Sequence, residues 1–213
     1  MLFTACNSPF SNKKENTSEF ENNENEIKIG NQVWMSKNLN VDKFRNGDAI
    51  PQAKTEKEWE EAGKNKQPAW CYYDNAPFNG EKYGKLYNWY AVNDSRGLAP
   101  KGWHVPTVLE WKILVEYLGV SDAGTKMKST SRWKQNGNGS NESGFNGIPG
   151  GTRYKSGYFD GIGNSGVWWS SSESKTDSDS FYIFELRSTA EETSISDFLD
   201  YKAQGGSVRC LKN

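Results

Sequence analysis

Few residues in this sequence belong to the types that carry out catalysis, and their spacing favours structure over chemistry. The single histidine, His104, lies between Trp103 and Val105 and two residues before Pro106. One histidine excludes a metal site made of several histidines, and a serine triad would depend on it entirely. We therefore expect His104 to be a packed, hydrogen-bonded core residue, and we predict no catalytic residues and no enzymatic activity.

Side chains with oxygen ligands suited to Ca²⁺ gather in two expected loops. They are Asp74, Asn75, Asn79 and Glu81 in the first loop, and Asp177 and Asp179 in the second. Neither group has the spacing of a specific calcium loop, and Asx turns explain both groups equally well. The sequence therefore predicts no metal and no cofactor, with calcium as the one alternative.

The pattern most typical of a binding surface is aromatic and lies between Gly150 and Glu173. Successive residues of a strand point to opposite faces, so a half-buried strand places one of Trp168 and Trp169 in the core and the other outside. Exposed aromatic rings suit stacking on sugars or contact with a protein partner. The candidate ligand-binding residues are Arg153, Tyr154, Tyr158, Trp168, Trp169 and Tyr182. The alternative is that both tryptophans belong to the core.

The elements that must position these residues are organised around positions 83–119. Thr107 and Glu110 have the T-x-x-E spacing of a capping box, and Gly119 occupies the place of a helix-ending glycine. Between them, apolar residues recur at helical spacing: Leu109, Ile113, Leu114, Tyr117 and Leu118. We predict a main helix over about 107–118 whose apolar face packs on a sheet. Residues 84–92 before it fit a buried strand or a short helix.

The rest of the chain predicts short strands and one or two further short helices. Gly30-Asn31 is a typical hairpin turn, and Thr55, Glu58 and Gly63 delimit a helix. A second short helix is expected over 122–129, and loops over 74–80 and 137–151. The expected strands are 26–29, 32–35, 70–73, 152–158, 167–172, 181–187, 193–201 and 207–211. Because these strands are neighbours in sequence, the sheet should be mostly antiparallel, which makes the fold class α+β.

The composition is that of a folded, aromatic-rich domain without a strong electric field. Of the 213 residues only 34% are hydrophobic, and they include 9 Trp, 10 Tyr and 10 Phe. The core must therefore be built from aromatic side chains more than from aliphatic ones. A net charge of -1 gives no field to attract nucleic acid or anionic lipid, so we predict no nucleic-acid partner.

The start of the chain is typical of an exported lipoprotein. MLFTAC, residues 1–6, is similar to the end of a bacterial lipoprotein signal, a remnant without the basic and longer apolar parts. Cys6 is then the expected lipidation site, and the Asn- and Glu-rich residues 7–25 form a disordered polar tether. We expect one folded domain over 26–213, held at the outer membrane or cell surface only by a lipid anchor. An ordinary disordered terminus with a free cysteine is the alternative.

Two further cysteines, Cys71 and Cys210, lie in expected strands near the two ends of the folded part. An exported location is oxidising, so we expect a disulfide that joins the early strand to the last one. Two buried free thiols are the alternative, because unpaired cysteine is often fully buried.

Five motifs follow one another along the chain: YGKLYNWYAVND, GLAPKGWHVPT-x-x-EW, NESGFNGIPGG-x-R, GNSGVWWSSSE and GGSVRC. Together they resemble the Fibrobacter succinogenes major paralogous domain family, over about Ile27 to Asn213. The resemblance implies a C-type-lectin-like fold, related to that of the formylglycine-generating enzymes and commonly carried by bacterial surface lipoproteins. It implies no particular activity, because a fold does not fix a function.

Relatives of that family suggest two activities that the residues of this chain do not support. Sulfatase-modifying enzymes of the fold use a cysteine pair near the C-terminus, and here Cys210 has no such neighbour. Calcium-dependent lectins use Glu-Pro-Asn or Gln-Pro-Asp and Trp-Asn-Asp tripeptides, which do not occur here. We therefore expect a non-catalytic surface module that binds an extracellular glycan or protein. A formylglycine-generating type of enzyme and a structural surface protein without a ligand are the alternatives.

Overall fold

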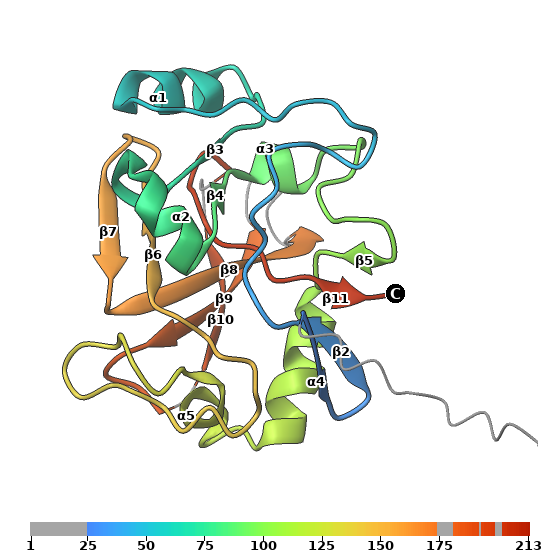
Figure 1. Ribbon diagram of the computed structural model, residues 1–213, viewed down its shortest axis with the longest axis vertical. Coiled ribbons are helices and arrows are strands. Elements are labelled where there is room, and N and C mark those ends of the chain that lie inside the picture. Colours follow the sequence, from blue (N-terminus) through green and yellow to red (C-terminus); the bar gives the residue numbers. More distant parts are fainter. Residues whose placement is uncertain (1–24, 174–180, 192, 199–201) are drawn as a thin grey trace, which may run out of the picture.

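The computed structural model describes residues 25–173, 181–191, 193–198 and 202–213. In this part of the chain, small sheets are surrounded by short helices and long connecting loops (Figure 1). No helix within it has both the length and the apolar composition needed to cross a membrane. The signal remnant 1–6 with Cys6, the tether up to residue 24, and the possible calcium ligands Asp177 and Asp179 lie outside the described residues.

The helices are α1 (Glu56–Lys64), α2 (Pro77–Tyr83), α3 (Trp89–Val92), α4 (Val108–Leu118) and α5 (Ala123–Met127), with a 3-10 turn, η1 (Tyr73–Asn75). The strands are β1 (Glu26–Ile29), β2 (Gln32–Met35), β3 (Trp70–Cys71), β4 (Leu86–Tyr87), β5 (Trp103–His104), β6 (Gly150–Arg153), β7 (Phe159–Ile162), β8 (Ser165–Glu173), β9 (Phe181–Arg187), β10 (Ser194–Phe198) and β11 (Leu211–Lys212).

The strands pair in three sheets within the described residues. One has the order β1-β2-β11-β5, the largest has the order β10-β9-β8-β6-β7, and β3 pairs with β4. All of these pairings are antiparallel except that of β6 with β8. The predicted class, α+β with mostly antiparallel strands, is therefore confirmed. The pairing of β11 with β2 brings the end of the domain back to its first hairpin (Figure 1).

The largest sheet is covered on both faces, which decides where the tryptophans of β8 lie. Trp168 packs with Phe184 and α4 on one face, and Trp169 packs with Trp89 of α3 on the other. The exposed fractions of Trp168 and Trp169 are 0% and 2%. The expectation that one of them faces outward is wrong, because a strand buried on both faces alternates between two cores. The alternative, two core tryptophans, is correct.

Helix α4 has the predicted bounds and lies against β8 and β9, but its buried face agrees only in part with the expected one, through Leu114 and Leu118. Trp111, Leu114, Val115 and Leu118 are buried, whereas Leu109, Ile113 and Tyr117 are 63%, 44% and 65% exposed. The helix has apolar residues on two faces, and spacing alone does not choose between them. Trp111 selects the buried face by stacking on Phe184, with ring centroids 4.3 Å apart and planes at 1°.

Local sequence signals position several other elements as predicted. The hairpin β1–β2 turns at Gly30-Asn31, where Gly30 has a φ of 60°. Thr55 and Glu58 form a complete capping box at α1, and Thr107 and Glu110 form another at α4. The 84–92 segment contains both of its predicted alternatives, first strand β4 and then helix α3.

Two predicted loops contain regular structure instead. The expected loop 74–80 includes the start of α2, where Pro77 occupies the first turn and needs no backbone donor there. Residues 159–162 were expected to be a turn around Asp160-Gly161, yet they form β7. The pairing of Arg153 with Phe159 and of Gly150 with Ile162 explains this, because β6 satisfies the backbone of β7.

Candidate functional site

A cleft of about 530 Å³ lies between α1, the turn 154–158 that joins β6 to β7, and the segment that begins at Lys202. It is lined by Glu60, Gly63, Lys64, Lys66, Tyr90, Lys155, Ser156, Lys202 and Ala203. Clefts of this volume are in the usual range for small-ligand sites. We therefore treat it as the candidate binding site of the domain.

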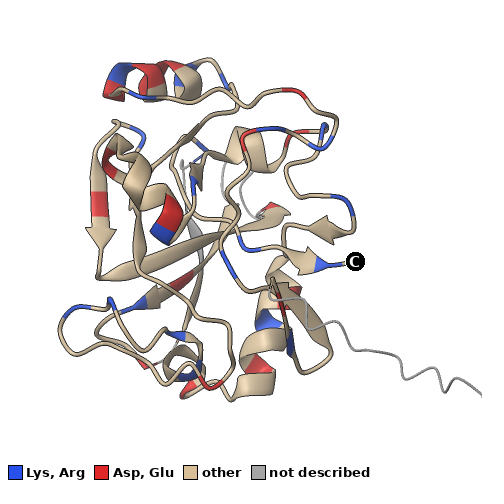
Figure 2. Ribbon diagram, viewed as in Figure 1, with Lys and Arg blue, Asp and Glu red and all other residues tan. Residues whose placement is uncertain are grey.

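Helix α1 forms one wall because a single large side chain holds it to the domain. Trp59 is the buried residue of this helix and is 1% exposed. The remaining positions are mostly charged, and red and blue alternate along α1 (Figure 2). The ion pairs Lys57–Glu61 and Lys64–Glu60, at 3.8 Å and 3.6 Å, are exposed and contribute little stability. The position of this wall therefore depends on what Trp59 packs against.

Arg153, at the end of β6, lies beneath the site and fixes both walls. Its guanidinium carbon is 4.8 Å from the ring centroid of Trp59 and 4.6 Å from that of Phe159. Its Nε donates to the carbonyl of Gly157 at 3.0 Å, and its Nη1 donates to the carbonyl of Ala53 at 3.1 Å. Arg153 is fully buried, so it positions the turn and α1 and does not contact a ligand at the surface.

Two glycines allow the walls to approach closely. A Cβ on Gly157, whose φ is 86°, would lie 2.7 Å from the Cα of Glu56 at the start of α1. A Cβ on Gly63 would lie 2.6 Å from the Cβ of Ala203. Both contacts are too short for any side chain larger than glycine without movement of backbone. The two glycines therefore define where α1 meets the turn and the 202–203 segment.

The turn 154–158 carries a pair of stacked, exposed tyrosines. Tyr154 and Tyr158 are 36% and 61% exposed. Their ring centroids are 6.2 Å apart, with an interplanar angle of 13°. The backbone N–H of Tyr154 donates to the carbonyl of Tyr158 at 2.7 Å, and that of Gly157 donates to the carbonyl of Tyr154 at 2.9 Å. These bonds hold both rings on the same turn that contributes Lys155 and Ser156 to the cleft.

Of the predicted ligand-binding residues, the structure brings together only those of β6 and its turn. Tyr154 and Tyr158 are at the surface, and Arg153 lies directly below them. Trp168 and Trp169 lie in the interior, where their indole N–H groups donate to Asn38 Oδ1 at 2.8 Å and to the carbonyl of Tyr87 at 2.7 Å. Tyr182 is half-buried on β9, in a different part of the sheet.

The lysines that line the cleft were not among the residues predicted from the sequence. Lys64 lies on the charged, exposed face of α1, and Lys66 follows the end of that helix. The amphipathic pattern of α1 indicates that such lysines are exposed, but not that they line a cleft. Lys202 lies with its Nζ 4.9 Å from the ring centroid of Phe181, a residue of the core. Nothing in the local sequence places Lys202 beside α1, because that proximity arises from the tertiary fold.

The expected disulfide between Cys71 and Cys210 is not present. Both are free thiols, each 0% exposed, and they belong to different hydrophobic clusters. Burial raises the pKa of Cys71 to about 12, against a smaller lowering by the Arg153 guanidinium beside it. Burial likewise raises the pKa of Cys210 to about 12. Thiols with such pKa values are poor nucleophiles at neutral pH, so both are structural core residues.

His104 links β5 to the start of α4. Its Nε2 is 2.9 Å from Glu110 Oε1, and its Nδ1 is 2.8 Å from Asn213 Oδ1. The side chain is half-buried and hydrogen-bonded, as expected, although it lies at the edge of the core and not inside it. Both ring nitrogens are engaged in hydrogen bonds, so neither is available to activate a nucleophile.

In the first group of candidate calcium ligands, Asn75 and Asn79 make hydrogen bonds within the protein. Asn79 donates to the carbonyl of Tyr73 at 2.9 Å, and Asn75 Oδ1 accepts from Arg153 Nη1 at 3.3 Å. Asp74 and Asn75 have positive φ values of 55° and 53°, typical of Asx residues in turns. Within the described ranges, no group of three or more His, Cys, Asp or Glu side chains is arranged to hold a metal ion.

The architecture and the cleft define an α+β domain with mostly antiparallel strands and a surface site formed by one helix and one hairpin turn. The sequence matches the Fibrobacter succinogenes major domain over residues 27–212, so the chain belongs to this family. No curated protein matches the chain, and no solved structure does either.

Proposed function

We propose that this chain is a non-catalytic binding module that holds a glycan against the exposed rings of Tyr154 and Tyr158, on the turn whose Lys155 and Ser156 line the adjoining cleft. The observation that carries the proposal is the nearly parallel pair of exposed rings on a turn that is fixed from below by Arg153. Large apolar rings kept at the surface of a domain whose other aromatic side chains are mostly buried suit a partner with flat apolar faces. The C–H faces of a pyranose ring have that property.

The polar groups of the cleft complement such a ligand. Lys64, Lys66 and Lys155 carry ammonium donors, and Ser156 carries a hydroxyl that both donates and accepts. Sugar hydroxyls need partners of both kinds when water is removed from them. The buried thiols and the doubly bonded His104 support a non-catalytic role, because neither is placed to attack a bound substrate.

We further propose that the domain has a C-type-lectin-like fold and is presented outside the cell on a lipidated Cys6. The return of β11 to β2 and the mostly antiparallel sheets support the first part. The MLFTAC start and the polar residues after it support the second part. Metabolic labelling with a palmitate analogue tests the anchor: label that persists in a Cys6→Ser variant would refute it.

The binding function is tested with the full chain on an array of cello-, xylo- and manno-oligosaccharides and N-acetylglucosamine oligomers, followed by calorimetric titration of the best binder. The double variant Tyr154→Ala/Tyr158→Ala should bind at least about fivefold more weakly, because ring contacts contribute about 0.5–1.5 kcal/mol each. Tyr117→Ala removes an equally exposed tyrosine from α4 and should bind normally. Failure of every oligosaccharide to bind, or equal weakening by Tyr117→Ala, would refute the glycan site.

A further inference from the structure

Arg209, in the segment that leads into β11, is a buried cation whose hydrogen bonds all go to neutral oxygens. It is 1% exposed. Its Nε and Nη2 donate to Asn38 Oδ1 at 3.0 Å and 2.8 Å, and its Nη1 donates to the carbonyls of Met35 and Phe145 at 3.2 Å and 2.6 Å. Its guanidinium carbon lies 4.4 Å from the ring centroid of Phe145. Within the described chain no carboxylate binds this guanidinium, although buried charges are normally paired.

These bonds leave one donor of the guanidinium unused. Arginine has five N–H groups, and the four bonds to Asn38, Met35 and Phe145 leave one Nη2 hydrogen without a partner among the described residues. The guanidinium fork is well matched to the oxygens of carboxylate, sulfate and phosphate groups. Arg209 therefore retains both a charge and a donor that an oxyanion can satisfy.

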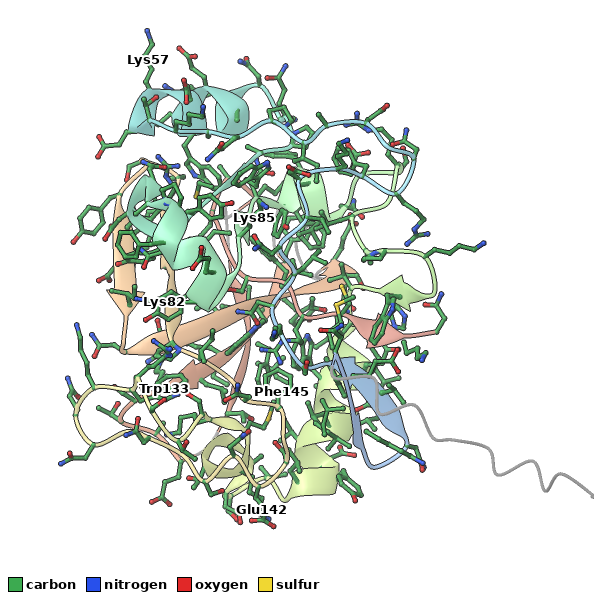
Figure 3. All side chains as sticks on the ribbon, in the orientation of Figure 1. Lys57, Lys82, Lys85, Trp133, Glu142 and Phe145 are labelled. Carbon is green, nitrogen blue, oxygen red and sulfur yellow. The ribbon has the colours of Figure 1, made fainter. Side chains whose placement is uncertain are left out.

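Arg209 also lines a hollow that is surrounded by further cations. The hollow has a volume of about 310 Å³ and lies between the 36–40 segment, the end of α2 and the loop that contains Trp133 and Phe145 (Figure 3). Lys37, Lys82 and Arg132 are exposed residues of its lining, and Glu81 is the one acidic residue of that lining. Lys82 lies in the last turn of α2, on the side that faces the loop of Trp133 (Figure 3).

The three exposed cations of the lining, Lys37, Lys82 and Arg132, form the mouth of the hollow and have no acidic partner in the described part of the chain. No ion pair involves Lys37, Lys82 or Arg132, and Lys82 Nζ instead lies 5.4 Å from the ring centroid of Phe78. Charges of one sign that line a concave surface raise the local concentration of ions of the opposite sign. The hollow therefore combines a buried guanidinium with an unbalanced positive mouth.

We propose that this hollow is an oxyanion site that takes a sulfate or phosphate group, with Arg209 as its buried cation and Lys37, Lys82 and Arg132 at its mouth. A volume of about 310 Å³ equals roughly ten water molecules at about 30 Å³ each, which accommodates one tetrahedral group with its remaining water. The group can be a free ion or an ester on a saccharide. The site uses none of the residues of the glycan cleft, so it does not depend on the proposed function.

The test uses mouth residues, because removal of Arg209 would break bonds to three segments and unfold the domain. The triple variant Lys37→Gln/Lys82→Gln/Arg132→Gln is compared with Lys57→Gln/Lys101→Gln/Lys112→Gln, which changes the net charge equally at exposed positions outside the hollow. Calorimetric titration of the full chain with inorganic sulfate, inorganic phosphate, a sulfated disaccharide and its unsulfated form is done at constant ionic strength and low millimolar concentration.

We expect the wild type and the control variant to bind at least one of the anions, and the mouth variant to bind it at least tenfold more weakly. Tighter binding of the sulfated disaccharide than of inorganic sulfate would identify an ester on a saccharide as the natural group, and equal binding would identify a free ion. The Tyr154→Ala/Tyr158→Ala variant should bind inorganic sulfate normally. Undetectable binding of all the anions, or equal losses in the mouth and control variants, would overturn the proposal.

Discussion

Arg153 and Arg209 are both fully buried, yet their surroundings give them different roles. Arg153 lies between Trp59 and Phe159 and bonds to the backbone of the turn, so it supports a surface from below. Arg209 donates a hydrogen bond to Asn38 Oδ1, which also accepts one from the indole N–H of Trp168. Through Asn38, the 36–40 segment is thus connected both to Arg209 and to the central sheet. For Arg209, burial lowers the pKa to about 9, so the group still carries its charge at neutral pH.

The first prediction concerns Arg153. Replacement by alanine should lower the free energy of unfolding by about 2–4 kcal/mol, because three acceptors lose a charged donor inside the core. Lys155→Ala, on the same turn but exposed, should change it by less than about 0.5 kcal/mol. Urea unfolding followed by tryptophan fluorescence measures both values. Equal effects of the two substitutions would show that Arg153 does not hold the turn.

The second prediction concerns the two buried thiols. In the folded protein at pH 8, iodoacetamide should leave Cys71 and Cys210 unmodified, because their pKa values of about 12 keep them protonated and their side chains are inaccessible. After unfolding in guanidinium chloride, both should be alkylated completely. Mass spectrometry of tryptic peptides under non-reducing conditions reads out each site. Rapid alkylation of the folded protein, or a bridged peptide, would contradict the structure.

At the scale of elements, α4 shows what determines which face of an apolar helix is buried. Apolar residues lie on both of its faces, and the face with Trp111 packs against the rings of Phe184 and Trp34. The capping box of Thr107 and Glu110 fixes the start of the helix and, through His104, its attachment to β5. The orientation of the helix is therefore set by aromatic packing, while its bounds are set by local capping.

The third prediction separates the two faces of α4. Leu114→Ala should reduce the free energy of unfolding by about 2–5 kcal/mol, since Leu114 is 0% exposed and its loss leaves a cavity. Leu109→Ala, at a 63% exposed position of the same helix, should change it by less than about 0.5 kcal/mol. Chemical denaturation of both variants is the measurement. A large effect of Leu109→Ala would mean that the opposite face is buried.

The fourth prediction concerns the pH dependence contributed by Glu110. Burial raises its pKa, but hydrogen bonds from Thr107 and His104 together outweigh burial and lower the pKa from its ordinary value. A carboxyl group with a lowered pKa stabilises the fold above the unfolded-state value and loses this contribution as the pH falls through the folded-state value. Glu110→Gln should therefore reduce stability at pH 7 by about 1 kcal/mol, the usual contribution of one hydrogen bond, because glutamine has a single acceptor oxygen whereas Glu110 uses one oxygen for His104 and the other for Thr107.

The same variant should also lose less stability than the wild type between pH 5 and pH 3. Glu116→Gln, at an exposed position of α4, is the matched control and should follow the wild-type curve. Urea unfolding at a series of pH values provides the comparison. A wild-type acid profile in Glu110→Gln would show that its carboxylate does not contribute in this way.

At the scale of the whole molecule, the features that could be predicted are those that depend on residues close together in the sequence. The turn Gly30-Asn31, both capping boxes and the course of β9 are local signals, and the structure confirms them. The burial of Trp168 and Trp169 on opposite faces, the choice of face on α4 and the absence of a Cys71–Cys210 bridge depend on which elements cover which. Such contacts join distant residues and leave no periodic pattern in the chain.

The same difference between local signals and long-range contacts applies to the candidate site. Tyr154 and Tyr158 were candidates because of their aromatic type, but they were expected within a strand over 152–158. The structure ends β6 at Arg153 and places both tyrosines at the surface of a turn. The lysines that line the cleft from α1 and from the 202–203 segment could not be predicted, because α1 reaches the turn only through the close approaches at Gly157 and Gly63.

The central claim, that the turn 154–158 and α1 form the ligand-binding surface, is tested most directly by NMR. An isotopically labelled full chain is titrated with the oligosaccharide selected on the array, and backbone amide shifts are followed residue by residue. The account predicts that the largest shifts occur at residues 154–158 and at Lys64 and Lys66. Shifts centred on the exposed face of α4, at Leu109, Ile113 and Tyr117, would contradict it.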